Sequence, residues 1–217
     1  MTPIPLQARS AFSLLRGVIR PEELPARAAA MGYPTLALTD VNSLAGAPAF
    51  VAAAQALGQR PLLGAELVWA GGHLVALIAS ERGYQQLCLL LTLLNRQQPP
   101  TPLTPTDLAA HQEGLHYLVD EAALAEQLLR AGASPRQLWL AVAPGVSSGQ
   151  QMRDLLHLAR RQRLPLVGHL PALLPSAADF PLHRLLAAIR LGCSLTDVPT
   201  EELVDPRAVL QVPAVAQ

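Results

Sequence analysis

Short apolar runs and longer amphipathic segments alternate along the whole chain. The clearest example lies in residues 32–67, where an apolar run at 34–39 predicts a buried strand. A helix is expected next at 44–57, with Ser43 as its N-cap, and the apolar run at 61–67 predicts a second strand. Strand, helix and strand within so few residues form a βαβ unit, which implies parallel strands and a right-handed crossover.

Two acids accompany these strands. Asp40 closes the first apolar run, and Glu66 stands near the end of the second. In a βαβ unit both acids then lie at the carboxyl ends of neighbouring strands. Barrels and open α/β sheets carry their chemistry at that edge, so Asp40 and Glu66 are the first candidate site residues.

The same alternation continues through most of the chain. Further strands are expected at 4–9, 115–119, 137–143 and 164–168, and a hairpin at 68–79 around Gly71-Gly72. Further helices are expected at 21–31, 80–95, from 104, 121–131, 148–163 and 176–192, and glycines follow several of them: Gly32, Gly58, Gly132 and Gly192. The loop at 97–105 is interpreted as a surface excursion within one domain. This many alternating units exclude an α+β fold and leave a βα barrel or a wound sheet.

Composition narrows the function classes. The 217 residues contain 16 acidic and 16 basic side chains, so no global field favours nucleic acid or an acidic partner. All the basic residues are arginine, which excludes lysine chemistry. Cys88 and Cys193 are far apart and are expected to be free thiols in a reducing cytoplasm. The start of the chain lacks the apolar core of a signal peptide, and the longest apolar run, 87–94, is too short for a membrane span.

A series of segments, in order, resembles a known family: FSLLRG, PEELPARAAAMGYPTLALTD, GQRPLLGAEL, ERGYQQLCLLLT, LARRQRLPLVG and LAAIRLG. They resemble the N-terminal polymerase-and-histidinol-phosphatase (PHP) domain of the bacterial DNA polymerase III alpha subunit, and more closely that of its error-prone type. The resemblance implies an α/β fold, a distorted (β/α)7 barrel in a single domain, with up to three divalent ions at the carboxyl ends of its strands. Such clusters hydrolyse phosphoesters or proofread 3′ ends. We expect the barrel domain at 1–195 and an irregular tail at 196–217 that leads toward a polymerase region absent here.

Most ligand positions of the family carry other residues in this chain. The resemblance places its first His-x-His on Gln7 and Arg9, a following acid on Arg16, and the histidine of its Thr-Asp-His motif on Val41, while Asp40 and Glu66 keep their acids. The late Asp-x-His falls near Pro171 and Leu173. A divalent site needs several convergent oxygen or nitrogen ligands, so we expect no metal, no other cofactor and no catalytic residue. The remnant pocket would comprise Gln7, Arg9, Arg16, Asp40, Val41, Glu66 and His169.

Each remaining residue has a plain structural reading beside the functional one. Asp40 and Glu66 are remnant ligands or polar residues at the ends of buried strands, and Arg9 is expected to pair with Glu66 in place of a metal. His169, after a strand, is the best remaining ligand candidate, although a hydrogen-bonded core histidine is the simpler interpretation. The arginines of 153–163 either contact phosphate or form a solvated helix face that the helix dipole favours.

Three hypotheses of function follow. The first is a metal-free, catalytically inactive PHP domain of an alpha-type, error-prone DNA polymerase, with roles in replication, repair and translesion synthesis. It would be a cytoplasmic structural module that packs against the remainder of the polymerase chain and meets DNA only indirectly, with no membrane contact and no small-molecule substrate. The second is a metal-dependent phosphoesterase or 3′–5′ exonuclease that uses Asp40, Glu66 and His169. The third is a free-standing protein whose emptied pocket binds an anion near Arg9 and Arg16.

Overall fold

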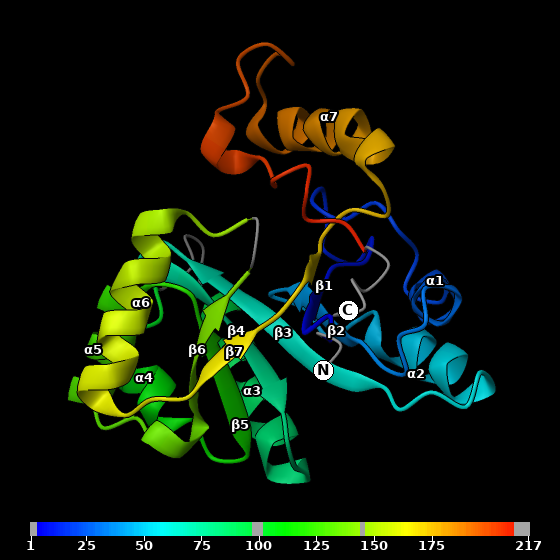
Figure 1. Cartoon of the computed structure of the whole chain (residues 1–217). Coiled ribbons are helices and arrows are strands. Elements are labelled where there is room, and N and C mark those ends of the chain that lie inside the picture. The colour runs from blue at the N-terminus through cyan, green and yellow to red at the C-terminus, as the bar shows by residue number, and fades with distance from the viewer. Residues whose placement is uncertain (1–3, 97–101, 144–145, 211–217) are drawn as a thin grey trace, which may run out of the picture. The chain divides into compact units, whose positions relative to one another are not determined.

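The computed structural model describes residues 4–96, 102–143 and 146–210 of the chain (Figure 1). Contacts divide the chain into two compact units. Unit 1 comprises Met1–Leu63 and His169–Gln217, and unit 2 comprises Gly64–Gly168. Each unit is built from strands and helices that alternate along the sequence, so the expected α/β class is confirmed.

Unit 1 contains a short parallel sheet and the first, second and last α-helices. Its elements are β1 (Gln7–Ala8), α1 (Glu23–Ala30), β2 (Ala37–Val41), α2 (Ala47–Ala56), β8 (Pro171–Ala172), α7 (Phe180–Leu191) and the 3-10 turns η2 (Ala177–Asp179) and η3 (Thr200–Glu202). Strand β1 is central, pairing in parallel with β2 on one side and β8 on the other. The core beneath these strands includes Tyr33, Leu36, Leu38 and Phe50, all almost fully buried.

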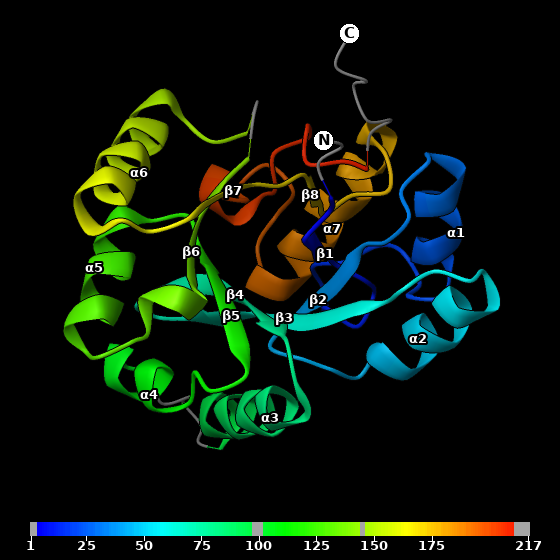
Figure 2. The same ribbon diagram turned by 60° about the horizontal axis from the view of Figure 1, so that its bottom comes forward.

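Unit 2 carries a longer sheet. Its elements are β3 (Leu62–Trp69, whose first two residues belong to unit 1), β4 (Gly72–Ile78), α3 (Glu81–Asn95), α4 (Pro105–Ala110), β5 (Leu115–Val119), α5 (Ala122–Arg130), η1 (Pro135–Gln137), β6 (Leu138–Val142), α6 (Gly149–Gln162) and β7 (Leu166–Gly168). Strand β4 is antiparallel to β3 and β5, whereas β5, β6 and β7 are parallel. Figures 1 and 2 show α3 to α6 covering one face of this sheet.

Many of the expected local elements are confirmed. The hairpin turns between Trp69 and Gly72, and the strand at 115–119 has the expected bounds. Ser80 caps α3 by accepting from the amide of Gly83. Thr104 and Ser148 each form a full capping box, with Asp107 and Gln151 respectively.

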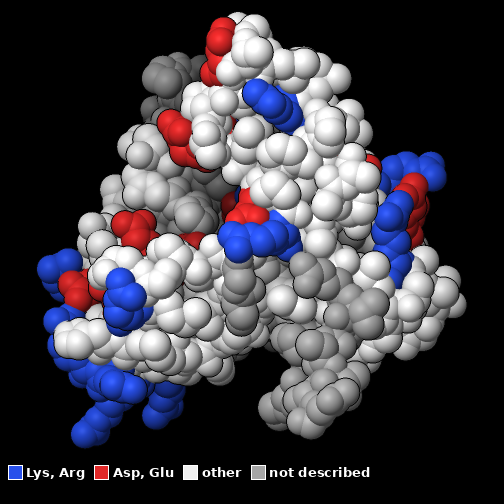
Figure 3. Space-filling model, turned by 45° about the horizontal axis from the view of Figure 1, so that its top comes forward, with Lys and Arg blue, Asp and Glu red and all other residues white. Residues whose placement is uncertain are grey.

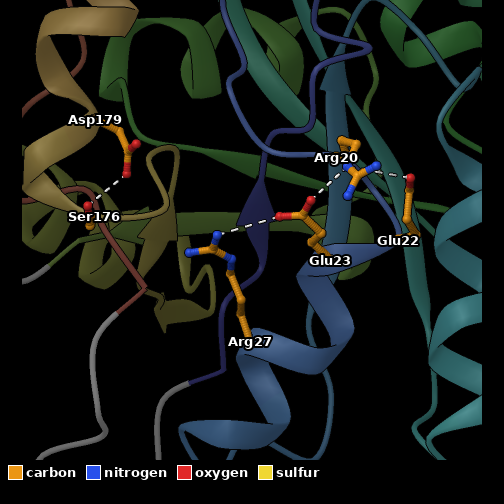
Figure 4. A network of polar contacts seen from close by, with 6 residues as sticks. All are labelled: Arg20, Glu22, Glu23, Arg27, Ser176 and Asp179. Atoms are coloured by element: carbon orange, nitrogen blue, oxygen red, sulfur yellow. Dashed lines mark hydrogen bonds and ion pairs between the residues drawn. The ribbon is translucent and has the colours of Figure 1, made fainter.

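Three helix starts differ from the prediction, and proline explains them. Helix α2 begins at Ala47 rather than Leu44, because a start at Leu44 would place Pro48 past the first turn, where it would remove a helical hydrogen bond. Ser43 is therefore not the cap, and its hydroxyl accepts only from the amide of Ala45. Helix α1 likewise begins at Glu23, which keeps Pro25 in the first turn; there Glu23 accepts from Arg20 and Arg27 (Figure 4).

The third helix that begins later than predicted is α7. Ser176 was expected to open the helix with a capping box, but it precedes the 3-10 turn η2, and α7 begins at Phe180, with Pro181 in its first turn. The hydroxyl of Ser176 donates to the carboxylate of Asp179 at 2.7 Å (Figure 4) and accepts no backbone amide of the helix. The helix ends at Gly192 in the left-handed conformation, as expected.

The ends of the described chain also depart from expectation. Only Gln7–Ala8 of the predicted strand at 4–9 joins the sheet ladder, since Pro5 has no amide to donate, although its carbonyl accepts from Ala37. Between Cys193 and residue 210 the chain forms η3, and Val209 forms a bridge with Leu174. Residues 97–101 of the predicted loop lie outside the described residues.

Two further expectations concern the thiols and the membrane. Cys88 and Cys193 are both free, as expected. Among the described residues no helix combines the length and apolarity needed to cross a bilayer.

Candidate functional site

The residues expected to form the remnant pocket are divided between the two units. Unit 1 holds Gln7, Arg9, Arg16, Asp40, Val41 and His169, and unit 2 holds Glu66. Arg9, Asp40, Glu66 and His169 are buried, whereas Gln7, Arg16 and Val41 are half-buried. Six of the seven residues therefore belong to unit 1.

Asp40 is the centre of a buried hydrogen-bond network. It is the fourth residue of β2, not the residue after the strand, and only 1% of it is exposed. Its Oδ1 accepts from the Ser10 amide and the Ser13 hydroxyl, both at 2.6 Å, and its Oδ2 accepts from the Ser10 hydroxyl at 2.7 Å. Both carboxylate oxygens thus receive donors from one short loop.

That loop, residues 10–17, is held in a tight conformation. The Ser13 hydroxyl also accepts from the amide of Val41, and the Ser10 hydroxyl accepts from the amide of Phe12. A Cβ at Gly17 would lie 1.8 Å from the carbonyl oxygen of Ser10, so only glycine fits there. The carboxylate of Asp40 fixes the loop to the end of β2, which is a structural task for a residue first considered as a ligand.

The backbone of Gly46 also lies close to the carboxylate of Asp40. A Cβ at Gly46, just before α2, would lie 2.7 Å from Asp40 Oδ2 and 3.1 Å from Ser10 Oγ. The absence of a side chain at Gly46 lets α2 begin directly against the network. Little room remains beside Oδ2 for an additional ligand.

Gln7 lies in β1, the strand that pairs with β2, and Arg9 directly follows β1. Gln7 pairs with Pro171, and the amide of Arg9 donates to the carbonyl of Ala172 at 3.4 Å. Arg9 is 8% exposed, so a fixed positive charge is buried at the position where the family resemblance places a metal ligand. The residues at the expected late ligand positions, Pro171 and Leu173, carry no metal-binding side chain.

His183 is a second buried polar centre, whose role no sequence pattern predicts. Its Nδ1 lies 3.0 Å from the carbonyl oxygen of Arg16, and its Nε2 accepts from the amide of Val204 at 3.2 Å. Because Nε2 must accept, Nδ1 carries the proton and donates to Arg16, so the ring is neutral. Burial lowers the pKa of His183, and the nearby charges of Arg9, Arg190 and Arg16 lower it further.

His183 therefore joins three segments that are remote in sequence. Helix α7 carries it, the carbonyl of Arg16 in the loop at 10–17 accepts its hydrogen bond, and the amide of Val204 after η3 donates to its other nitrogen. Like Asp40, it positions the loop and does not present a reactive group to solvent. Serine spacing and a buried histidine on a short helix were too common as patterns to single out Ser10, Ser13 or His183.

Glu66 lies within β3, opposite Val75 of β4, and is 3% exposed. The expected pairing of Glu66 with Arg9 joins residues of different units, and it stays a prediction. Two histidines of unit 2 have ordinary structural partners. Trp139 donates to His116 at 3.1 Å, and His73 lies 3.2 Å from a carboxylate oxygen of Asp120.

A model of the PHP domain family matches residues 5–149, which is well over half of the chain. The chain belongs to the PHP domain family. Similar proteins include the error-prone DNA polymerases of Methylococcus capsulatus, 35% identical over 89% of this chain, and of Aromatoleum aromaticum, 36% identical over 92%. The DNA polymerase III subunit alpha of Bacillus subtilis is 28% identical over 94% of the chain. The chain spans about a fifth of the length of these curated relatives.

Solved structures place this PHP domain in the same fold. A candidate metal-dependent phosphoesterase from Bifidobacterium adolescentis superposes with a TM-score of 0.54, covering 78% of this chain and 88% of that one at 14% identity. An amidohydrolase from Chromobacterium violaceum, solved with sulfate and without metal, gives a TM-score of 0.50 at 18% identity, covering 76% of this chain and 85% of that one. At these identities the likeness concerns the fold alone. The resemblance read from the sequence is thereby confirmed for the family and the fold class.

The donor set of this PHP domain does not fit the divalent ions associated with its family. Among the described residues, no group of three histidine, cysteine, aspartate or glutamate side chains converges as metal ligands. Asp40, the acid of the Thr-Asp-His motif, already accepts three protein hydrogen bonds, and a cation beside it would face the donated hydrogens. The buried side chain of Arg9 adds a positive charge, which would repel a divalent cation. No chemical step through a metal is derived for this site.

Proposed function

We propose that this chain is a metal-free, catalytically inactive PHP domain of an alpha-type, error-prone DNA polymerase. It acts as a structural module that supports template-directed DNA synthesis carried out elsewhere in the polymerase. The observation that carries the proposal is the carboxylate of Asp40, whose two oxygens are committed to Ser10 and Ser13. A ligand position of the family is used here to hold a loop.

The outer face of α7 supports the role of a packing module. This helix buries small residues, Ala187 and Ala188, and exposes large apolar ones: Leu182 is 46% exposed, Leu185 43% and Ile189 57%. The exposed residues stand at i, i+3 and i+7, so they form one stripe along the helix. A soluble helix normally buries such a stripe, and an exposed one marks an interaction surface.

We assign this stripe to the remainder of the polymerase chain. The relatives are about five times as long as this chain, so a PHP domain of their kind has neighbouring polymerase regions to pack against. Because these relatives are error-prone DNA polymerases, the proposal includes error-prone synthesis, translesion repair and a cytoplasmic location. The polymerase activity itself would reside in those regions.

Metal content tests the inactive state directly. Protein purified without chelators is analysed for Zn, Mn and Fe, and is then titrated with Zn²⁺ and Mn²⁺ by calorimetry. We expect well below one equivalent of metal and no saturable site that depends on Asp40. A full equivalent that disappears in Asp40→Ala and Glu66→Ala would overturn the proposal.

That result would favour the second hypothesis, a phosphoesterase or 3′–5′ exonuclease using Asp40, Glu66 and His169. The third hypothesis, an anion site near Arg9 and Arg16, is tested in the same titrations with sulfate and inorganic phosphate. We expect neither anion to bind there.

A further inference from the structure

The C-terminal turns of α5 and α6 in unit 2 carry an arginine cluster. Its members are Arg130 of α5, Arg160 and Arg161 of α6, and Arg163, which caps α6 in the left-handed conformation. All four side chains are exposed. Figure 3 shows blue arginine side chains gathered at the lower left of the face in view.

A cavity of about 340 Å³ lies between the two helices at this end. Its lining comprises Glu126, Leu129, Arg130, Arg161 and Gln162. Arg161 reaches across from α6 to form an ion pair with Glu126 of α5. One guanidinium is thus held in place at the wall, while that of Arg130 lines the cavity.

The cluster carries more positive than negative charge. Several exposed arginines elsewhere form ion pairs with acids, as Arg20 and Arg27 do with Glu23 (Figure 4) and Arg207 does with Asp205. Within the described part of the chain, Arg130, Arg160 and Arg163 have no acidic group within 4.0 Å. Four arginines and the single Glu126 leave an excess of three positive charges.

The helix dipoles account for only part of this excess. Each helix C-terminus carries roughly half a negative charge, so two of them offset about one of the three surplus positive charges. The remaining charge is uncompensated by the protein, although the chain as a whole has a formal net charge of zero. An anionic partner with several charges fits this local excess better than a single ion does.

We propose that this cluster and its cavity bind the phosphate backbone of duplex DNA. Planar guanidinium groups match phosphate oxygens through paired hydrogen bonds. No aromatic side chain lines the cavity, so it lacks the stacking platform typical of single-strand binders and offers no reading of base edges. Binding is therefore directed to the backbone, and it is independent of sequence and sensitive to salt. The choice of DNA over another duplex rests on the proposed polymerase function, but the contact itself does not.

Fluorescence anisotropy of the whole chain with two short labelled duplexes of unrelated sequence tests the cluster. The variant Arg130→Gln/Arg160→Gln/Arg163→Gln leaves the Arg161–Glu126 pair intact. We expect it to lower the affinity about tenfold or more, and to reduce the slope of log K against log salt by about 2 to 3. Both duplexes should respond alike.

Arg153→Gln is the matched control, because it removes one exposed charge from the same helix, two turns nearer its N-terminus. It should change the affinity less than twofold, whereas Arg160→Gln and Arg163→Gln should each weaken binding and lower the salt slope by about 1. Equal losses in control and cluster variants would reduce the effect to net charge and overturn the proposal. If polyglutamate binds as tightly as DNA, the surface is assigned to an acidic polypeptide. If inorganic phosphate displaces DNA at an equal concentration of phosphate groups, the cluster is only an anion site. Both outcomes contradict a DNA contact. If the DNA-binding experiments give any of these contrary results, the proposal of a metal-free PHP domain still stands, because it rests on Asp40.

Discussion

Replacing Asp40 by alanine should destabilise unit 1 severely, because it leaves three buried hydrogen-bond donors without their acceptor. The Ser10 amide and the hydroxyls of Ser10 and Ser13 all lose their acceptor, and both serines are fully buried. Hydrogen bonds to a charged group contribute about 1.5 to 3 kcal/mol each, and an unpaired buried donor costs a similar amount. Since the three share one carboxylate and are not additive, we expect a loss of about 3 to 5 kcal/mol.

Ser13→Ala should cost less, about 1.5 to 3 kcal/mol, because it removes one bond to the carboxylate and the acceptor of the Val41 amide. Ser43→Ala is the matched control on the neighbouring segment, since its hydroxyl accepts only from the Ala45 amide at a partly exposed position. It should stay within about 0.5 kcal/mol of the parent. Asp40→Ala combined with Ser13→Ala closes a double-mutant cycle, and a coupling of about 0.5 to 3 kcal/mol is expected.

Denaturant unfolding followed by circular dichroism gives the free energies. Hydrogen exchange at the amides of Ser10 and Val41 reports the loop itself, and both should lose protection in Asp40→Ala. An Asp40→Ala protein within about 1 kcal/mol of the parent would refute the reasoning. So would stabilisation by Zn²⁺ or Mn²⁺ that requires Asp40, because the carboxylate would then be a ligand and not an anchor for the loop.

Three further predictions concern activity, charge and pH. The chain should show no phosphatase or 3′ exonuclease activity with added Mn²⁺ or Zn²⁺; activity that Glu66→Ala abolishes would contradict this. If Arg9 pairs with Glu66, Arg9→Ala should cost about 2 to 4 kcal/mol and Arg9→Leu with Glu66→Leu should recover much of it, whereas additive losses in that cycle would exclude the pair. The pKa of His183 is lower in the folded than in the unfolded chain, so the unfolded chain takes up a proton first as the pH falls below about 6.5. The free energy of unfolding should therefore decrease from that pH until the pKa of the folded state is passed. His183→Gln should remove this pH dependence in unfolding experiments.

The sequence predicts the features that depend on local signals. The caps at Ser80, Thr104 and Ser148 join residues three positions apart, and the Gly71-Gly72 turn is likewise a local event. Helix starts at 44 and 176 were wrong for a local reason as well. The polar residue suited a cap, but Pro48 and Pro181 must fall within the first turn, and that constraint outweighs the cap.

The site was harder to predict, since its contacts are remote in sequence. Asp40 meets Ser10 and Ser13 across 30 and 27 residues, and His183 meets Arg16 across 167. The apolar run at 34–39 predicted a buried position for Asp40 near the end of a strand, and this is confirmed, but neither the pattern nor the family resemblance identified its hydrogen-bond partners. The serines that use it lie within the very segment, FSLLRG and its approach, that carries the resemblance.

A metal site and a loop anchor make similar demands on an acid, which is why the retained residue alone cannot distinguish them. Each needs a buried carboxylate with convergent positive partners, either a cation or several hydrogen-bond donors. In this chain the partners of Asp40 are two hydroxyls and an amide, which together satisfy both oxygens without a metal. The acid is then required for the fold of unit 1, and its retention argues for stability before chemistry. The separation of the two roles rests on the donors that surround the carboxylate, and in the proposed function the serines at 10 and 13 stand where an ion would otherwise share Asp40 with other ligands.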